Sequence, residues 1–129
     1  MKCAVLVVDD ELSIRNFFED TLAGSGCTVH TSENADDALS VLEREDINVI
    51  FLDLKLFGMN GIELCRKIRN QKPLSVIYAM TGWSGLFEIE ECREAGFDDF
   101  FSKPVSSASI EKAVEDGFEK IARWKSRHR

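Results

Sequence analysis

Apolar residues recur along this chain in two different patterns. Short apolar or β-branched runs, four to six residues long, stand at five places and are typical of buried strands. Between and after them, apolar residues repeat at spacings of three and four, which indicates helices with one buried face. The pattern predicts strands at residues 3–8, 27–31, 48–53, 75–80 and 98–101.

Asparagine and glycine residues mark where several helices begin and end. Asn34 and Asn60 stand where their side chains can cap the second and third helices, and Gly96 follows the fourth, expected at about 87–95. The last helix carries an apolar stripe, and we expect Trp124 to end that stripe in the core rather than to bind a partner. The residues assigned to the core without any function are Phe17, Phe18, Phe51, Phe118 and Ile121.

The order of these elements defines a fold class. Five apolar strands that alternate with five helices predict a parallel sheet covered on both faces. The expected fold is α/β: a single doubly wound, five-stranded parallel sheet with five helices, a flavodoxin-like (βα)5 three-layer sandwich. We expect one domain at residues 1–124 and a basic tail at 125–129. Ligands of such sheets bind outside the carboxyl ends of the strands.

Polar side chains follow the predicted strands at that edge. Asp9 and Asp10 come after the first strand, Asp53 ends the third, Thr81 follows the fourth and Lys103 follows the fifth. Carboxylates brought together repel one another unless a cation lies among them, and oxygen donors without histidine or cysteine favour Mg²⁺ or Mn²⁺. A carboxylate beside such an ion can attack phosphorus and form an acyl phosphate.

These residues carry a resemblance to a known family. From about Met1 to Trp124 the chain resembles a response-regulator receiver domain of two-component signalling, the type that includes the stand-alone chemotaxis regulator. The resemblance rests on several separated motifs in one order, each weak alone. They are Val8-Asp9-Asp10-Glu11, the segment from Asp53 to Gly61 (Asp-Leu-Lys-Leu-Phe-Gly-Met-Asn-Gly), Met80-Thr81-Gly82, the segment from Ala95 to Phe100, and Lys103-Pro104.

The resemblance implies a role for each residue of the acidic edge. Asp53 would be the phosphoacceptor, which takes a phosphoryl group from a histidine kinase or a histidine phosphotransfer protein. Asp10 would be a direct metal ligand, Asp9 would act through water, and the backbone carbonyl of Lys55 would complete the metal shell. Lys103 would pair with the phosphoryl group, and a cis bond to the proline that follows would aim it.

The resemblance also implies a switch. Thr81 would move toward the phosphoryl oxygens, and Phe100 would turn inward behind it. The surface formed by the fourth helix, the fifth strand and the fifth helix would then change shape for an output protein or an output domain, and a homodimer through the fourth and fifth helices is possible. Such a phosphoprotein is a signalling module rather than an enzyme, although it assists its own phosphotransfer and dephosphorylation.

Four positions either depart from the family pattern or stand where the family adjusts the lifetime of the phosphoryl group. Phe57 replaces the usual proline in the loop after the phosphoacceptor, and it is either a contact or a cover over the rim. Phe100 lacks the hydroxyl of the common tyrosine. Lys55 and Trp83 stand two residues after Asp53 and Thr81, at positions that tune phosphoryl lifetime in the family, and we expect them to shield the acyl phosphate from water.

Other functions remain open at this point. An Mg²⁺-dependent aspartyl-nucleophile phosphohydrolase would generally carry a second acid two residues after the nucleophile, where this chain has Lys55. A flavin or nucleotide binder would use residues 81–85 as a phosphate loop, but acids replace the glycine-rich turn after the first strand. A degenerate receiver that acts only as an interaction module would lack site residues that this chain keeps.

Composition and charge limit where the protein can reside and what it can bind. The 129 residues are 44% hydrophobic and suit one soluble domain, and the longest apolar run is too short for a membrane span. The net charge is −7 although residues 120–129 carry five basic and no acidic side chains, so direct nucleic-acid binding is not expected. Four widely spaced cysteines predict buried thiols in a reducing cytoplasm, with neither a zinc site nor a disulfide.

Overall fold

The computed structural model describes residues 3–56, 58–82 and 86–126, and the side chains of 86–88 are outside that description. Five parallel strands form one sheet in the order β2-β1-β3-β4-β5. The strands are β1 (Ala4–Val8), β2 (Thr28–Ser32), β3 (Val49–Asp53), β4 (Val76–Thr81) and β5 (Asp99–Ser102). The helices are α1 (Leu12–Leu22), α2 (Ala35–Arg44), α3 (Gly61–Gln71), α4 (Leu86–Ala95) and α5 (Ser107–Ser126).

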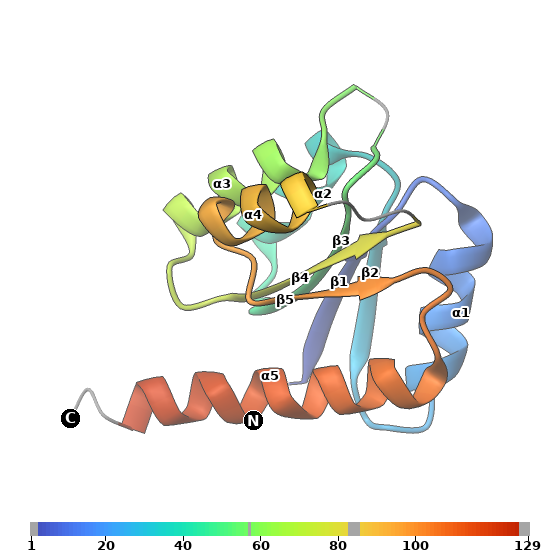
Figure 1. Ribbon diagram of the computed structural model, residues 1–129. Helices are drawn as coiled ribbons and strands as arrows, with labels where there is room; N and C mark the ends of the chain where they lie inside the picture. The colour runs from blue at the N-terminus through green and yellow to red at the C-terminus, as the bar shows by residue number, and fades with distance from the viewer. Residues whose placement is uncertain (1–2, 57, 83–85, 127–129) are drawn as a thin grey trace.

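The helices cover both faces of the sheet. Figure 1 shows α2, α3 and α4 on one face and α1 and α5 on the other. Because side chains alternate along a strand, β1 supplies both cores: Leu6 and Val8 pack under α2 and α3, whereas Val5 and Val7 pack toward α1 and α5. The predicted three-layer α/β fold is therefore confirmed.

The strand order places a crevice between β1 and β3. The chain adds β2 on one side of β1 and then crosses to add β3, β4 and β5 on the other. Connections therefore leave the carboxyl ends of β1 and β3 toward opposite faces, and the gap between them is the usual ligand site of such sheets. The residues that follow these two strands are those predicted to carry the chemistry.

The element boundaries lie close to those predicted from the sequence. Each strand begins one residue later than expected, and α4 begins one residue earlier. Asn34 accepts a hydrogen bond from the Asp37 backbone N–H at 2.8 Å, and Asn60 accepts one from Glu63 at 2.8 Å, so both predicted caps are confirmed. Among the described helices, none is long and apolar enough to cross a membrane.

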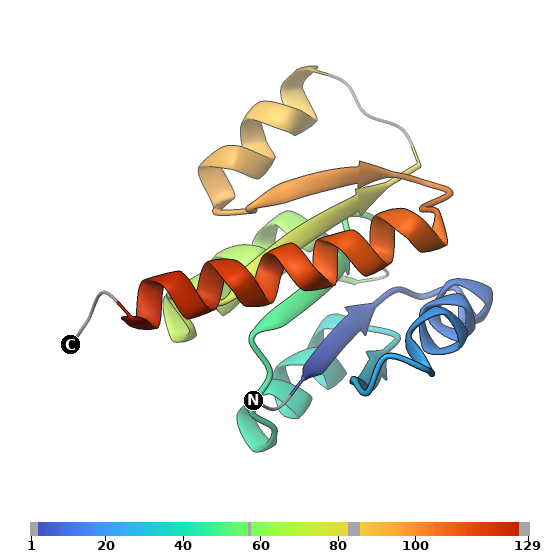
Figure 2. The same cartoon turned by 90° about the horizontal axis from the view of Figure 1, so that it is seen from below.

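Two of the aromatic core assignments are wrong. Phe17 is 39% exposed, because Phe18 and Leu22 already form the face of α1 that packs on the sheet. Trp124 is 49% exposed, because the last turns of α5 extend past the ends of the strands (Figure 2). Phe18, Phe51 and Ile121 are buried as expected, and Phe118 is half-buried against the same core.

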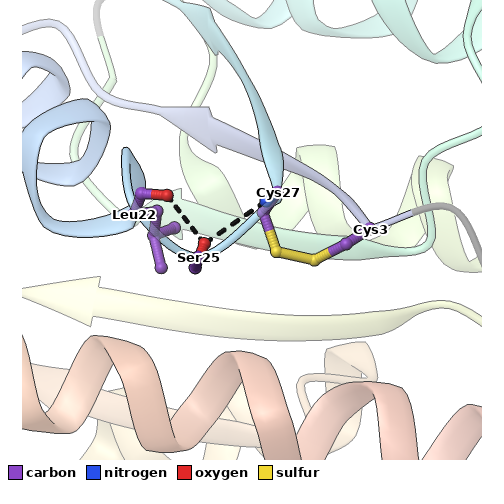
Figure 3. The surroundings of a disulfide bond; sticks show 4 residues. All are labelled: Cys3, Leu22, Ser25 and Cys27. Atoms are coloured by element: carbon purple, nitrogen blue, oxygen red, sulfur yellow. Dashed lines mark hydrogen bonds between the residues drawn. A yellow bond between two sulfur atoms is a disulfide. The ribbon is translucent and has the colours of Figure 1, made fainter.

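The cysteine prediction is wrong for one pair. Cys3 and Cys27 form a disulfide, with a Cα–Cα distance of 4.6 Å (Figure 3). The sequence did not predict this pair because it depends on strand register. Each cysteine directly precedes one of the two paired residues, Ala4 and Thr28. Cys65 and Cys92 are buried thiols, as expected, and burial raises the pKa of Cys65 to about 12.

Candidate functional site: an acidic cluster at the carboxyl ends of β1 and β3

Three aspartates meet at the crevice. Carboxylate oxygens of Asp9, Asp10 and Asp53 all lie within 4.8 Å of one another. We call these residues the acidic cluster. Asp9 and Asp53 are buried and Asp10 is exposed, so the cluster has two fixed carboxylates and one that faces solvent. The structure thus brings together the three acids that the sequence placed at separate strand ends.

Backbone contacts hold Asp9 in place. Its N–H donates to the Ser32 carbonyl at 3.0 Å, and its Oδ1 accepts from the Glu11 N–H at 2.9 Å. Arg15 reaches back from α1 and donates to the Asp9 carbonyl at 2.7 Å. Sequence reasoning missed Arg15, whose only signal was a basic residue on the first turns of the helix that follows the acids.

Asp53 ends β3 with its side chain turned into the crevice. Its Oδ1 accepts a hydrogen bond from the Lys55 N–H at 3.1 Å, while the next residue, Leu54, donates to the Met80 carbonyl at 3.0 Å. Burial raises the pKa of Asp53, and the charge of Asp9 adds to that effect, although the Lys55 N–H and Lys103 oppose it. The site therefore disfavours a bare Asp53 carboxylate and would gain from an added positive charge.

Lys103 joins the two buried acids. Its Nζ lies 2.8 Å from Asp9 Oδ2, 3.1 Å from Asp53 Oδ2 and 3.7 Å from Glu11 Oε1. Burial alone would lower the pKa of Lys103, but hydrogen bonds to Asp9 and Asp53 and their charges outweigh it and raise that pKa. Lys103 is therefore a fixed cation over the cluster, and its bond to Pro104 is cis, as the resemblance implied.

The remaining predicted residues lie in different surroundings. Thr81 is buried at the end of β4, and its carbonyl accepts from the Lys103 N–H at 2.7 Å, so both residues share the rim with Asp53. Phe100 is half-buried on β5 and packs against the core under α4. The side chain of Lys55 is exposed. The predictions for Phe57 and Trp83 lie outside the described residues.

The donor set of the acidic cluster fits Mg²⁺ or Mn²⁺. All three side chains offer carboxylate oxygens, which hard divalent cations prefer. The cluster carries three carboxylates, and Lys103 lies against two of them, Asp9 and Asp53. Burial and the charge of Asp9 both raise the pKa of Asp53. A divalent cation held by these residues would offset the negative charge of the cluster.

Gly61 brings the start of α3 against the end of β3. Its N–H donates to the Leu54 carbonyl at 2.9 Å. A Cβ at this position would lie 2.8 Å from Leu54 Cα and closer still to the Asp53 carbonyl oxygen, both of which are backbone atoms that have little freedom to move. The helix can therefore pack on the end of β3 only with glycine here.

We expect Gly61→Ala to lower the free energy of unfolding by about 2 kcal/mol, because the methyl group overpacks against backbone. Urea titration followed by circular dichroism would measure it. Gly24→Ala is the matched control, since a Cβ there meets nothing within 4 Å, and its expected change is close to zero or slightly stabilising. Equal midpoints for the two variants would contradict the close approach.

The fold and this cluster together define a class of protein: a doubly wound parallel α/β domain with an acidic site beside the switch point. A family model described as the response regulator receiver domain matches residues 5–115. The chain therefore belongs to the response regulator receiver family.

Individual relatives agree with this assignment. The chain is 35% identical over 115 residues to the alkaline phosphatase synthesis transcriptional regulatory protein PhoP of Bacillus subtilis, which covers 89% of this chain and 48% of that relative. This chain thus spans about half the length of that curated relative.

Solved structures show the same fold. A CheY-like receiver domain protein from Methanospirillum hungatei superposes with a TM-score of 0.90 at 25% identity, over 95% of this chain and 98% of that one. Chemotaxis protein CheY4 of Vibrio cholerae superposes with a TM-score of 0.85 at 25% identity, over 91% and 99% of the two chains.

Proposed function

We propose that this receiver domain is switched by phosphorylation of Asp53, with a histidine kinase or histidine phosphotransfer protein as the donor. The observation that carries the proposal is Lys103 held 3.1 Å from Asp53 Oδ2 beside two further carboxylates. A buried carboxylate with other charged side chains around it suits acyl-phosphate chemistry.

The proposed reaction is a displacement at phosphorus. A carboxylate oxygen of Asp53 attacks the phosphorus of the donor phosphohistidine, the P–N bond breaks, and its electron pair stays with the imidazole nitrogen. The product is a mixed anhydride at Asp53. The anhydride is then hydrolysed: water attacks phosphorus, inorganic phosphate leaves, and the Asp53 carboxylate is restored. Lys103 meets the negative charge of the phosphoryl group in both steps.

We propose that Asp10 and Asp53 hold Mg²⁺ or Mn²⁺ directly, that Asp9 binds it through water, and that the Lys55 carbonyl completes the shell. When bound, the ion supplies charge neutralisation between Asp53 and the incoming phosphoryl oxygens. Burial of Asp9 and its hydrogen bond from Glu11 keep that carboxylate oriented toward the crevice. The exposed Asp10 can adjust to the ion as it enters.

The proposed output is a change of surface. The phosphoryl group on Asp53 would carry about −1.5 to −2 charge units in place of the single charge of the carboxylate, and Thr81 can approach it from the end of β4. Movement of Thr81 would let Phe100 turn inward from its half-buried position on β5. We propose that α4, β5 and α5 then present an altered surface to an output protein, an attached output domain or a second copy of this chain.

The proposed setting follows from the family. We place the domain, at residues 1–124, in the cytoplasm and treat 125–129 as a tail, although α5 continues through Ser126. The relative from Bacillus subtilis is a transcriptional regulatory protein, which favours an output domain that regulates transcription. This domain itself acts as a signalling module and assists its own phosphotransfer and dephosphorylation.

Phosphoryl lifetime offers one prediction. We expect Lys55→Ala combined with Trp83→Ala to shorten the half-life of phosphorylated Asp53, because these side chains would shield the anhydride from water. Decay of the phosphorylated mass with time measures it, and Lys67→Ala serves as a control with an exposed lysine on α3. An unchanged decay rate in the double variant would remove the proposed shielding role.

The first experiment is intact mass after incubation with acetyl phosphate and Mg²⁺. We expect one phosphoryl adduct in the wild type, no adduct with Asp53→Asn, and none when Mg²⁺ is chelated. Asp20→Asn, an exposed aspartate on α1, should still form the adduct. An adduct that survives in Asp53→Asn would overturn the assignment of the acceptor.

A second outcome would point to another function. Receivers differ in their use of small donors, so a negative result with acetyl phosphate is followed by the same assay with a phosphorylated histidine phosphotransfer protein. Absence of an adduct with both donors would favour an interaction module without phosphotransfer. Continuous release of phosphate from small phosphate esters would instead favour a phosphohydrolase.

A further inference from the structure

We propose that Cys3 and Cys27 are a redox modification site, at which a reversible disulfide ties the edge strand β2 to β1. The inference is independent of the phosphorylation proposed above. It assigns a chemical role to a pair of residues outside the acidic cluster. The disulfide itself is shown in Figure 3, where it joins the start of β1 to the turn that leads into β2.

Backbone contacts other than the disulfide hold the segments that carry the two cysteines next to each other. Thr28 donates its N–H to the Cys3 carbonyl at 2.8 Å, and the strand ladder continues from Ala4 and Thr28. Ser25 holds the preceding turn: its Oγ donates to the Leu22 carbonyl at 2.7 Å and accepts from the Cys27 N–H at 3.3 Å (Figure 3). The reduced pair would therefore stay in position to close again.

Access distinguishes this pair from the other cysteines. Cys3 and Cys27 are both half-buried, at one end of the sheet, so a small thiol can reach the bond. Cys65 and Cys92 are buried between α3 and α4, and burial raises the pKa of Cys65 to about 12, which removes its reactive thiolate. Oxidants should therefore act on the first pair and leave the second.

The redox step is thiol–disulfide exchange with a small-molecule disulfide of the glutathione class. One cysteine thiolate attacks the oxidant and releases one thiol, and the second cysteine then attacks the mixed disulfide and releases another. The protein loses two electrons and two protons, and the oxidant is reduced to two thiols. A dithiol reductant reverses both steps.

The bond should act on stability rather than on the acceptor chemistry. It closes a segment with a sequence separation of 24 that contains β1, Asp9, Asp10 and α1, and it fastens β2, which pairs only with β1 in the described sheet. The acidic cluster lies at the opposite ends of the strands, about 17–20 Å away along the sheet. Oxidation should thus raise the melting temperature and leave Mg²⁺ affinity unchanged.

The test uses the whole chain in glutathione buffers of graded ratio. After equilibration, the protein is denatured and alkylated, and intact mass counts the blocked thiols. We expect two alkylated cysteines at the oxidising end and four at the reducing end, with a midpoint between them. The oxidised form should melt on the order of 10 °C higher than the reduced form.

Matched variants assign the effect to the pair. Cys3→Ser and Cys27→Ser should each lose the redox dependence of the melting temperature, whereas Cys65→Ala should keep it. Four alkylated cysteines at every ratio would overturn the proposal, because no bond forms. Two at every ratio would also overturn it, because the bond is not reversible. Equal melting temperatures for both forms would remove its effect on stability.

Discussion

Lys103→Met should tighten Mg²⁺ binding several-fold and slow phosphorylation of Asp53 by about 100-fold. The two effects have opposite signs because Lys103 has two relations to the acidic cluster. Its Nζ lies 2.8 Å from Asp9 Oδ2 and 3.1 Å from Asp53 Oδ2, where it competes with any added cation for carboxylate charge. It is also the fixed cation available to a phosphoryl group at Asp53.

Two measurements separate these effects. Isothermal titration gives the Mg²⁺ dissociation constant, and the rate of adduct formation at saturating Mg²⁺ gives the phosphorylation effect alone. Lys67→Met is the control, since this exposed lysine on α3 lies outside the site. Weaker Mg²⁺ binding in Lys103→Met would show that the lysine organises the carboxylates rather than competing for them.

The second large effect is expected far from the acidic cluster. Arg69→Ala should lower the free energy of unfolding by about 3 kcal/mol. The Arg69 guanidinium donates to the carbonyls of Gly96, Pro73 and Ser75 and lies 2.8 Å from Asp98 Oδ2. One side chain therefore joins α3 to the loops before β4 and β5.

Removal of Arg69 leaves several acceptors without their donor. Asp98 would keep the Ile77 N–H at 2.8 Å and the Lys120 ammonium, but three carbonyls would lose a charged partner. The Arg69 side chain is 25% exposed, so water replaces part of the loss, and the expected cost is set below that of a fully buried pair.

Urea unfolding of Arg69→Ala beside Arg66→Ala measures the effect. Arg66 is exposed on the same helix, so its replacement controls for helix propensity and net charge. A difference below about 1 kcal/mol between the two variants would mean that the Arg69 contacts add no more than an ordinary surface interaction.

The sequence predicted the fold well because its strands are buried on both faces. Apolar runs such as Val5–Val8 are buried on both faces of the sheet, and helix caps such as Asn34 and Asn60 set the starts of the helices. Phe17 was misassigned because two adjacent phenylalanines on a helix point in different directions, and composition does not say which one faces the sheet.

The site was predictable to the extent that it follows from strand ends. Five residues lie at or just after the carboxyl ends of parallel strands, so topology alone brings them to one edge: Asp9, Asp10, Asp53, Thr81 and Lys103. The contacts of Arg15, and those joining Arg69 to Asp98, depend on side-chain reach across elements. They join residues up to 29 positions apart, and nothing in a single sequence marks such pairs.

The disulfide between Cys3 and Cys27 was not predicted for a related reason. Spacing along the chain gave no signal, since the two residues are 24 positions apart. What places them together is the register of β1 against β2, and register is a property of the sheet rather than of either strand. The two thiols can be identified as neighbours only once the pairing of β1 with β2 is known.

The exposure of Trp124 makes the protein suited to optical work. The chain has two tryptophans, and Trp124 is half exposed near the end of α5, a helix about 30 Å long that begins four residues after Lys103. Its emission should therefore be red-shifted, readily quenched by acrylamide and indifferent to Mg²⁺. With Trp124→Phe, the fluorescence comes from Trp83 alone, two positions after Thr81 in the sequence, and any change on adding metal can be read without a background.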